Sequence, residues 1–498
     1  MWFGAMACGA VVRDGRVAGV VVATPQGRGV VLAKDVVDAT GNADIAAAAG
    51  ARCEFLGAGE IALQGAGLSE RRLGESYINS DWGYVNECDA VDLWLFGVRG
   101  RAGAARNSWD VSQATETRER RRIVGTVVVS PLDVVNERTF PDTIVQGRSD
   151  FDSHGPSVDD ICYVSEANGK KIYGVNVPYR AILPEKTDGL AVVGLGISAH
   201  RDALPLMRMQ PDVQNAGYAA GVAAAMAAEK GTELRAIDVK ELQKHLVEKG
   251  IIPEEVLSWE DNAGVDTERW LTAVRDMGDG YKGVSIVLSD PARAVPALRD
   301  AYAKATTPSA RLVYAHVLGI LGDATGADTL AGQVSGRDPQ IAINAQGLAA
   351  FGRRMSERDS FIVALGRTRS PHALEPLLGE LAKVGAGTPP AHVRALSLAL
   401  EALGDPRAAP AIAAALSKPG ISGWARSCAA AVTPSGGFCS SPESGRCLRE
   451  LNLARALYAC GDHEGVAKSI FEAYAADGRG VFALHACAVL GRSDTRAN

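Results

Sequence analysis

The sequence predicts an α/β region followed by an all-α region of helical repeats. Three observations lead to this prediction. Short apolar strands fill the first fifty residues and end in a glycine turn that opens an alanine-rich helix. A buried strand, a second glycine turn and a long helix follow near residues 190–230. From about Val284 the strand signals stop, and amphipathic helices with a period of about 3.6 residues replace them.

The first strands are predicted to form a β-meander. Residues 2–12 and 16–24 are β-rich stretches on either side of Asp14-Gly15, and Asp-Gly is a strong hairpin signal. A further strand, "GVVLAKDVVDATG" at residues 29–41, ends at Gly41. A strand, a tight glycine turn and a helix start form the geometry that receives a nucleotide phosphate. On its own, such a turn is equally typical of a plain strand-to-helix connection.

Residues 52–180 are predicted to cover a site with loops, short helices and strands. The stretch up to residue 120 mixes Gly, Trp, Tyr and charged residues. An arginine-rich helix end containing Arg121 and Arg122 then leads into a β-branched strand. The stretch "DTIVQGRSDFDSHG" gives another strand and a polar turn that contains His154.

The second glycine turn follows the apolar strand "LAVVG" and contains Gly194 and Gly196. A long helix is predicted from about Asn215, and small residues such as Gly217 let it pack closely against a sheet or a ligand. Open α/β sheets place their ligands at the carboxyl ends of their strands. Free N–H groups at a helix start favour an anion there. This second turn is therefore the other candidate ligand-binding element.

The C-terminal region repeats a small unit that consists of an apolar helix end, a glycine, a polar turn and a new amphipathic helix. Such units lie around Gly322, Gly366, Gly404 and Gly461. Their spacing is irregular and close to the roughly 40 to 47 residues of HEAT or armadillo units with insertions. A stacked α-solenoid fits, because no single unit can bury its apolar face alone. An ordinary helical bundle is the alternative.

Composition excludes several classes of protein. The net charge is −6, with 47% apolar and 22% charged residues, which argues against a nucleic-acid footprint or a basic membrane-binding face. No stretch reaches the roughly 18 apolar residues of a membrane span. The nine cysteines form no CxxC pair, so we expect no metal site. Cys439 and Cys447 flank a loop and would either bridge in an exported protein or remain free thiols.

Residues from about Gly9 to Pro253 resemble the rear portion of the FAD-dependent oxidoreductases. These are glutathione-reductase-like flavoproteins, and the resemblance is to their fumarate-reductase-like, xanthan-lyase-labelled group. The matching stretches are residues 15–51, 118–134, 150–155, 177–227 and 237–250. The resemblance implies a Rossmann-type FAD-binding domain with a β-rich substrate domain inserted. We expect its parts at 1–51, 52–180 (substrate or cap region) and 181–253, then a linker at 254–284 and HEAT-like repeats at 285–498.

That family begins with a βαβ unit carrying G-x-G-x-x-G, whose glycines let a helix start contact the FAD pyrophosphate. No such motif follows an N-terminal strand in this sequence. We therefore expect that at least this unit of roughly 30 residues is missing. A misassigned start or a truncated or split gene would explain it, and a partner chain that supplies the missing part is a further explanation. The chain as written is expected to bind FAD poorly.

The resemblance also implies site residues. His154 is a candidate acid or base that faces the flavin, although a loop histidine is often only a surface residue. Arg121 is a candidate anchor for a substrate anion or the flavin pyrimidine, with a solvated helix end as the alternative. At Leu195 the family more often carries Arg, so part of the usual flavin contact differs here. The expected cofactor-binding residues are Thr40, Gly41, Gly194, Gly196, Ser198 and Gly217.

The resulting functional hypothesis is an FAD-dependent oxidoreductase that transfers a hydride between a small organic substrate and flavin. The rival hypothesis is a helical-repeat interaction module that carries a degenerate flavoprotein remnant. A protein or polymer is the expected partner of the repeats.

Overall fold

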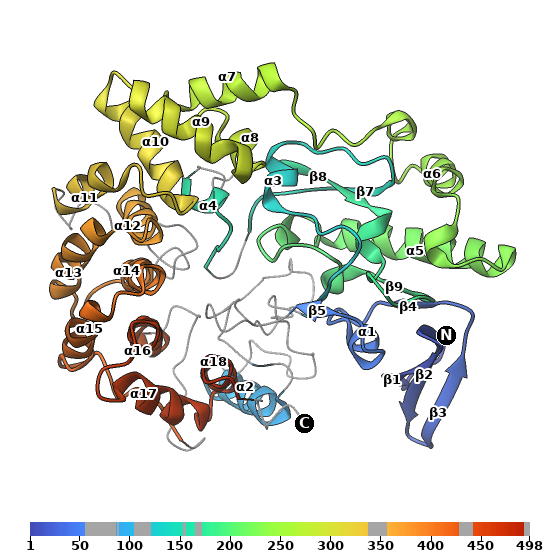
Figure 1. Ribbon diagram of the computed structural model, residues 1–498. Helices are drawn as coiled ribbons and strands as arrows, with labels where there is room; N and C mark the ends of the chain where they lie inside the picture. The colour runs from blue at the N-terminus through green and yellow to red at the C-terminus, as the bar shows by residue number, and fades with distance from the viewer. Residues whose placement is uncertain are drawn as a thin grey trace. The chain divides into compact units, whose positions relative to one another are not determined.

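The computed structural model describes residues 1–54, 86, 89–103, 121–152, 156–164, 172–336, 356–427 and 442–492 (Figure 1). These residues divide into two compact units. We call residues 1–54, 121–152 and 172–266 the sheet unit. The helical unit contains residue 86 and residues 89–103, 156–164, 267–336, 356–427 and 442–492.

The N-terminal strands form the predicted meander. Strands β1 (Met6–Arg13), β2 (Arg16–Thr24) and β3 (Gly27–Leu32) are antiparallel in the order β1-β2-β3. Asp14 and Gly15 make the β1–β2 turn with φ of 52° and 78°. Two successive positive φ values are what a two-residue hairpin turn needs, because they match the twist of the strands. The hairpin prediction is confirmed.

The single strand expected at residues 29–41 is divided in the structure, because β3 ends at Leu32 and a separate strand begins at Val36. Strand β4 (Val36–Asp38) pairs in parallel with β9 (Leu190–Val192), so the ends of the two apolar runs meet. Helix α1 (Asp44–Ala48) follows β4, and α5 (Gln210–Lys230) follows β9 after a loop. Helix α5 starts earlier than the expected Asn215, with a proline in its first turn, where the missing N–H costs nothing. The core of this region is formed by Val17, Val36, Ile45, Ile123 and Val192, with other small apolar residues.

The remaining elements of the sheet unit are short. Two antiparallel pairs join β5 (Cys53–Glu54) to β6 (Arg122–Ile123) and β7 (Thr143–Ser149) to β8 (Tyr173–Pro178). Helices α3 (Pro131–Val135) and α6 (Val239–Glu248) accompany them. Short 3₁₀ turns occur at Tyr179–Ile182, Gly194–Gly196, Leu204–Leu206, Leu234–Ala236 and Glu254–Ser258.

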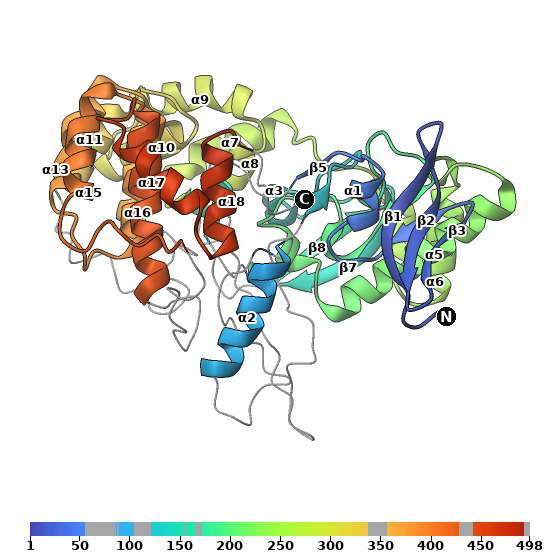
Figure 2. The ribbon, with the colours of Figure 1, turned by 90° about the horizontal axis from the view of Figure 1, so that it is seen from below.

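The helical unit is built from two rows of helices that follow one another along the chain (Figures 1 and 2). The inner row is α10 (Pro308–Ile320), α12 (Glu357–Arg367), α14 (Pro390–Leu403) and α16 (Pro442–Ala459), each packed against the next. The outer row is α11 (Ala327–Ser335), α13 (Leu374–Ala382), α15 (Ala409–Leu416) and α17 (Val466–Ala475). The other helices are α2 (Ala90–Gly103), α4 (Ile161–Val164), α7 (Thr267–Met277), α8 (Val284–Leu288), α9 (Pro291–Lys304) and α18 (Gly480–Val489).

The helical unit differs in extent from the expected repeat region. It begins at Thr267 rather than 285, because α7 lies within the expected linker and packs against α8 and α9. It also takes in residues 156–164, which the sequence analysis assigned to the substrate region. No helix in the described parts of the chain is long and apolar enough to cross a membrane.

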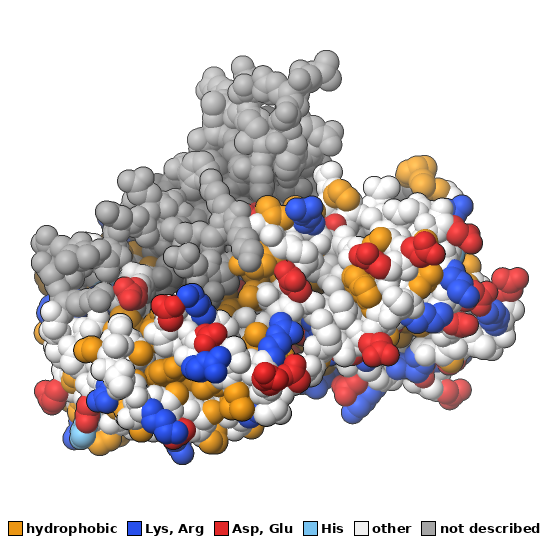
Figure 3. Space-filling view, turned by 90° about the horizontal axis from the view of Figure 1, so that it is seen from above, with side chains coloured by type: hydrophobic (Ala, Val, Ile, Leu, Met, Phe, Trp, Pro, Cys, Tyr) orange, Lys and Arg blue, Asp and Glu red, His pale blue; other side chains and the backbone are white. Residues whose placement is uncertain are grey.

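Charged side chains are mixed in sign on the described surface shown in Figure 3, where Lys and Arg lie among Asp and Glu. This distribution agrees with the modest net charge of −6. Large exposed apolar side chains are found on the meander, at Trp2, Phe3, Met6, Val30 and Leu32.

Candidate functional site

The two predicted glycine turns lie side by side at the carboxyl ends of β4 and β9. Val36 donates to the carbonyl of Gly189 at 2.9 Å, and Val193 donates to the carbonyl of Asp38 at 3.0 Å. Gly41 and Gly194 have φ of 80° and 74°, and a Cβ added to either would meet no atom within 4 Å. The backbone at these two turns is therefore open to a ligand, and glycine is needed there for its conformation.

Asp38 fixes the first of these turns. One carboxylate oxygen accepts from the Thr40 amide at 3.0 Å and the Thr40 hydroxyl at 2.7 Å. The other accepts from the Ile45 and Ala46 amides, both at 3.0 Å. The side chain is buried and supplies acceptors for N–H groups at the start of α1 that have no partner within the helix. Asp38 thus shapes the turn, a role that sequence reasoning did not assign to it.

Thr40 has a dual role in the turn. Its hydroxyl donates to Asp38 and accepts from the Asp44 amide at 2.9 Å, while the residue remains exposed. The next residues approach Gly196, whose added Cβ would lie 3.0 Å from the Cβ of Ala43. Ala43 is buried and holds a left-handed conformation, with φ of 50° and ψ of 42°, which is strained for a residue other than glycine. The two turns are therefore in close contact with one another.

Ser198 and Gly217 lie differently from Thr40 and Gly41. The Ser198 hydroxyl is fully buried and accepts from the Gly125 amide at 2.9 Å. Ser198 therefore joins the second turn to the segment after β6. Gly217 lies in α5, and an added Cβ there would meet nothing within 4 Å. Among the expected cofactor residues, Thr40 is exposed, and Gly41, Gly194 and Gly217 have open space where a side chain would lie.

Arg121 is brought to the first turn by the strand that follows it. Its amide donates to Asn42 Oδ1 at 3.0 Å, and its guanidinium lies 3.4 Å from Asp44 Oδ1. This places a cation within the sheet unit beside the Gly41 turn, as a role in anion binding requires. His154, the other candidate catalytic residue, lies outside the described residues.

A cavity of about 350 Å³ runs along β4. Its lining combines apolar side chains of the meander with the strand and the first turn: Ala7, Val20, Val31, Ala33, Asp35, Val36, Val37, Asp38, Ala39, Thr40 and Ile45. Because Val36 and Asp38 bond to β9, the N–H and C=O of Val37 between them point to the opposite edge. The cavity is therefore bounded on one side by a strand edge that the described residues leave open.

The second turn also matches a motif that the sequence analysis missed. Residues 194–199 spell G-x-G-x-x-A directly after a parallel strand. The motif binds a pyrophosphate when a helix opens directly from it. Here a 3₁₀ turn and a loop follow, and α5 begins only at Gln210. The spacing is thus a chance resemblance in the wrong structural context.

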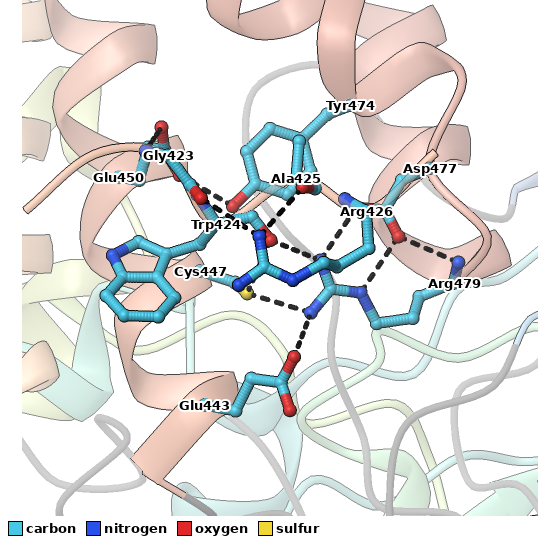
Figure 4. Close-up of polar contacts among 10 residues, drawn as sticks. All are labelled: Gly423, Trp424, Ala425, Arg426, Glu443, Cys447, Glu450, Tyr474, Asp477 and Arg479. Carbon is cyan, nitrogen blue, oxygen red and sulfur yellow. Dashed lines mark hydrogen bonds and ion pairs between the residues drawn. The ribbon is translucent and has the colours of Figure 1, made fainter. Parts of the chain in front are cut away.

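A second candidate site is a cluster of interacting polar side chains in the helical unit (Figure 4). The Glu450 carboxylate accepts from the Gly423 amide at 2.8 Å, the Trp424 amide at 3.0 Å and the Tyr474 hydroxyl at 2.8 Å. Three donors therefore satisfy this buried carboxylate. It fastens the segment before α16 to the helices rather than facing a ligand.

Arg479 completes the same cluster. Its guanidinium pairs with Asp477 at 2.7 Å, contacts Glu443 at 3.2 Å and donates to the carbonyl of Trp424 at 2.7 Å. The nitrogen that contacts Glu443 also lies 3.1 Å from the Cys447 sulfur. Burial raises the pKa of the Cys447 thiol to about 11, so it is protonated and unreactive at neutral pH. Cys447 is a free thiol, and Cys439, the other half of the expected pair, lies outside the described residues.

Comparison with known proteins gives one family. Two overlapping stretches, residues 1–66 and 61–246, match the family described as FAD dependent oxidoreductase. Together they cover the described sheet unit through α6. No curated protein and no solved structure matches the chain.

Proposed function

We propose that this chain, whose residues 1–246 match the FAD dependent oxidoreductase family, is a member of that family that transfers a hydride between a small organic substrate and flavin. The observation that carries the proposal is the meeting of the Gly41 and Gly194 turns at the carboxyl ends of β4 and β9. That edge is where open α/β sheets hold their ligands. Both turns lie within the residues that match the family.

The residues present fit one side of an FAD site. Gly41 and Gly194 leave their backbone open to the cofactor, and Thr40 stands exposed between β4 and α1. When bound, FAD supplies the ring that accepts or gives the hydride. Arg121 would hold an anionic group of the substrate or cofactor. His154 would hold or move a proton, and Gly196, Ser198 and Gly217 would support the second turn and α5.

The finer proposal is that the phosphate-binding βαβ unit comes from sequence outside residues 1–498. The open edge at Val37 and the cavity beside it support this, because a two-stranded parallel sheet is incomplete by itself. The side chains of Val30 and Leu32 on the neighbouring meander are 56% and 61% exposed. An added strand on β4 would extend the sheet beneath the meander and would supply the pyrophosphate site.

The helical unit is proposed to be a HEAT-like solenoid. Each inner helix packs against the next, and α11, α13 and α15 pack along a second row, as stacked repeats do. Such a row offers an extended surface for a protein or polymer partner.

Flavin binding tests the function directly. We expect the 498-residue chain to show no saturable binding in an FAD fluorescence titration, and the same chain to retain flavin when an upstream in-frame G-x-G-x-x-G segment is restored. Saturable micromolar binding by the chain alone would overturn the proposal that a unit is missing, yet it would support the flavoprotein function. Failure of the restored protein to bind flavin would favour the rival, an interaction module with a flavoprotein remnant.

A further inference from the structure

Residues 156–164 belong to the helical unit, although the rest of that unit is distant from them in the sequence. Strand β7 ends at Ser149 and β8 begins at Tyr173, and both strands belong to the sheet unit. The segment therefore lies between two strands of the sheet unit in the sequence but packs with the helices.

Helix α4, which lies within this segment, is apolar and buried. All four of its residues are buried: Ile161, Cys162, Tyr163 and Val164. It packs against α8, α10 and α12. Burying four apolar side chains contributes several kcal/mol, at about 1.5–3 kcal/mol for each large one. The packing of α4 therefore contributes substantially to stability, unlike that of a loop on the surface.

A chain of hydrogen bonds ends on this segment. Tyr281 contacts His316 Nδ1 at 2.7 Å, His316 Nε2 contacts Ser360 Oγ at 2.7 Å, and Ser360 Oγ donates to the carbonyl of Tyr163. A carbonyl can only accept, so the single Ser360 proton goes to Tyr163 and Ser360 accepts from His316 Nε2–H. His316 Nδ1 then accepts from the Tyr281 hydroxyl. Each hydrogen bond in the chain therefore has one possible direction, and the last acceptor is the Tyr163 carbonyl in the docked segment.

Because of these hydrogen-bond directions, Ser360 holds the segment in place and does not act as a nucleophile. Burial lowers the pKa of His316 to about 3, so its ring is neutral and carries one proton. That proton is on Nε2 and is given to Ser360, so His316 has no free nitrogen on the side of Ser360 to act as a base. The arrangement of Tyr, His and Ser serves to hold the segment in place.

Two arginines hold the rest of the segment. Arg367 pairs with Asp160 at 2.6 Å, and its guanidinium lies 5.1 Å from the centre of the Tyr163 ring. Arg394, which is buried in α14, donates to the carbonyl of Ser157 at 3.2 Å. Two of the contacts with residues 156–164 are made to backbone carbonyls and one to a side-chain carboxylate.

We propose that the inner helices of the helical unit form an intramolecular clamp for residues 156–164, in which Ser360, Arg367 and Arg394 are the positioning residues. These three residues hold a segment that lies within the substrate region expected from the sequence, and the clamp itself does not depend on the proposed function.

The thiol of Cys162 reports on the clamp in the full chain. Alkylation is followed by peptide mass spectrometry, with the buried Cys460 of the helical unit as internal reference. We expect Ser360→Ala and Arg367→Ala each to speed Cys162 alkylation by about tenfold, since each removes a strong contact with residues 156–164. Cys460 should keep its rate. The matched controls are Ser417→Ala and Arg407→Ala, whose contacts lie within their own short segments.

Two results would overturn the clamp. One is an unchanged Cys162 rate in both variants, and the other is an equal rise at Cys162 and Cys460, which means global loosening. Hydrogen exchange on α4 tests the positioning role. We expect the Cys162 and Tyr163 amides to exchange faster in a Ser360→Ala, Arg367→Ala double variant. Protection equal to that of the parent would show that these side chains do not hold the segment. None of these measurements uses flavin, so their outcome is independent of the FAD titration.

Discussion

A Cβ built on Gly196 would lie 3.0 Å from the Cβ of Ala43 and 3.1 Å from its backbone nitrogen. The two glycine turns are thus packed against one another at this point. Gly196 was expected to face the cofactor, but the structure gives it a neighbour from the protein itself. Its smallness is explained by the close approach of the β9 turn to the start of α1.

We expect Gly196→Ala to destabilise the sheet unit by about 1–3 kcal/mol, because the added methyl overpacks a buried contact. Urea unfolding followed by circular dichroism measures this loss. Ala43→Gly should restore part of it in the double variant, since it removes the opposing methyl and the left-handed strain. Gly217→Ala is the control and should stabilise α5 by up to about 1 kcal/mol. Simple additivity of the Gly196 and Ala43 changes would contradict the contact.

Local signals made much of the sheet unit predictable. Asp14-Gly15 forms its hairpin because the turn chemistry is contained in two residues. The strands ending at Asp38 and Val192 were recognisable as apolar runs before glycine turns, whereas their pairing with one another is shown only by the structure. Arg121 lies beside the Gly41 turn, and its role in anion binding stays a prediction.

Long-range relationships could not be predicted from the sequence. The Asp38 carboxylate caps a helix that starts after a strained Ala43, and no local pattern announces this. The contact of Ser360 with Tyr163 joins residues about two hundred positions apart, and helical periodicity carries no information about such a partner. Helix α7 was not predicted either, because its short amphipathic pattern resembled a linker beside the long repeats.

Asp38→Ala should cost about 2–3 kcal/mol of unfolding free energy, because four donors lose their acceptor and two of them belong to α1. Asp38→Asn keeps the shape but loses one acceptor oxygen, so it should fall between the parent and the alanine variant. Asp44→Ala is the control on the exposed side of the same turn. Equal stability of the Asp38 and Asp44 variants would show that the cap contributes nothing. The readout is the urea midpoint of the sheet unit.

His316 should make the helical unit less stable in acid. Its folded pKa of about 3 lies below its ordinary value of 6.5, so the unfolded chain binds the proton more readily. The stability is therefore complete above pH 6.5 and is lost as the pH falls toward 3, by at most about 1.4 kcal/mol per pH unit. Thermal melts across this range measure the slope. A His316→Gln variant should have a shallower slope, and an identical slope would exclude His316 as its source.

Cys447 should make the helical unit less stable at alkaline pH, whereas His316 does so in acid. Burial raises its folded pKa from 9.0 to about 11, so the unfolded thiol ionises first. The contribution is fully present below pH 9 and is lost as the pH rises through 11. Melting the helical unit at pH 9 and 10, before most tyrosines ionise, isolates the thiols from them. Cys447→Ser should reduce the fall in melting temperature, while Cys8→Ser, at an exposed site, should leave it unchanged.

Residues 267–498 should fold without the sheet unit, since stacked repeats are stabilised mainly by their neighbours. The starting point matters, because Trp270 and Met277 of α7 are buried against the unit and Arg293 lies 4.2 Å from the Trp270 ring. We therefore expect residues 267–498 to melt cooperatively and at a higher temperature than residues 285–498, which lack α7. Each buried side chain of this size contributes about 1.5–3 kcal/mol, so the difference should amount to several degrees. Equal melting of the two segments would show that α7 adds nothing to the repeats, and absence of any helical transition in either would refute their independent folding.

A synthetic peptide of residues 156–164 should raise the melting temperature of residues 267–498 further, because it refills the site of α4 on α8, α10 and α12. The same peptide with Asp160 replaced by Asn should stabilise less, since it cannot pair fully with Arg367.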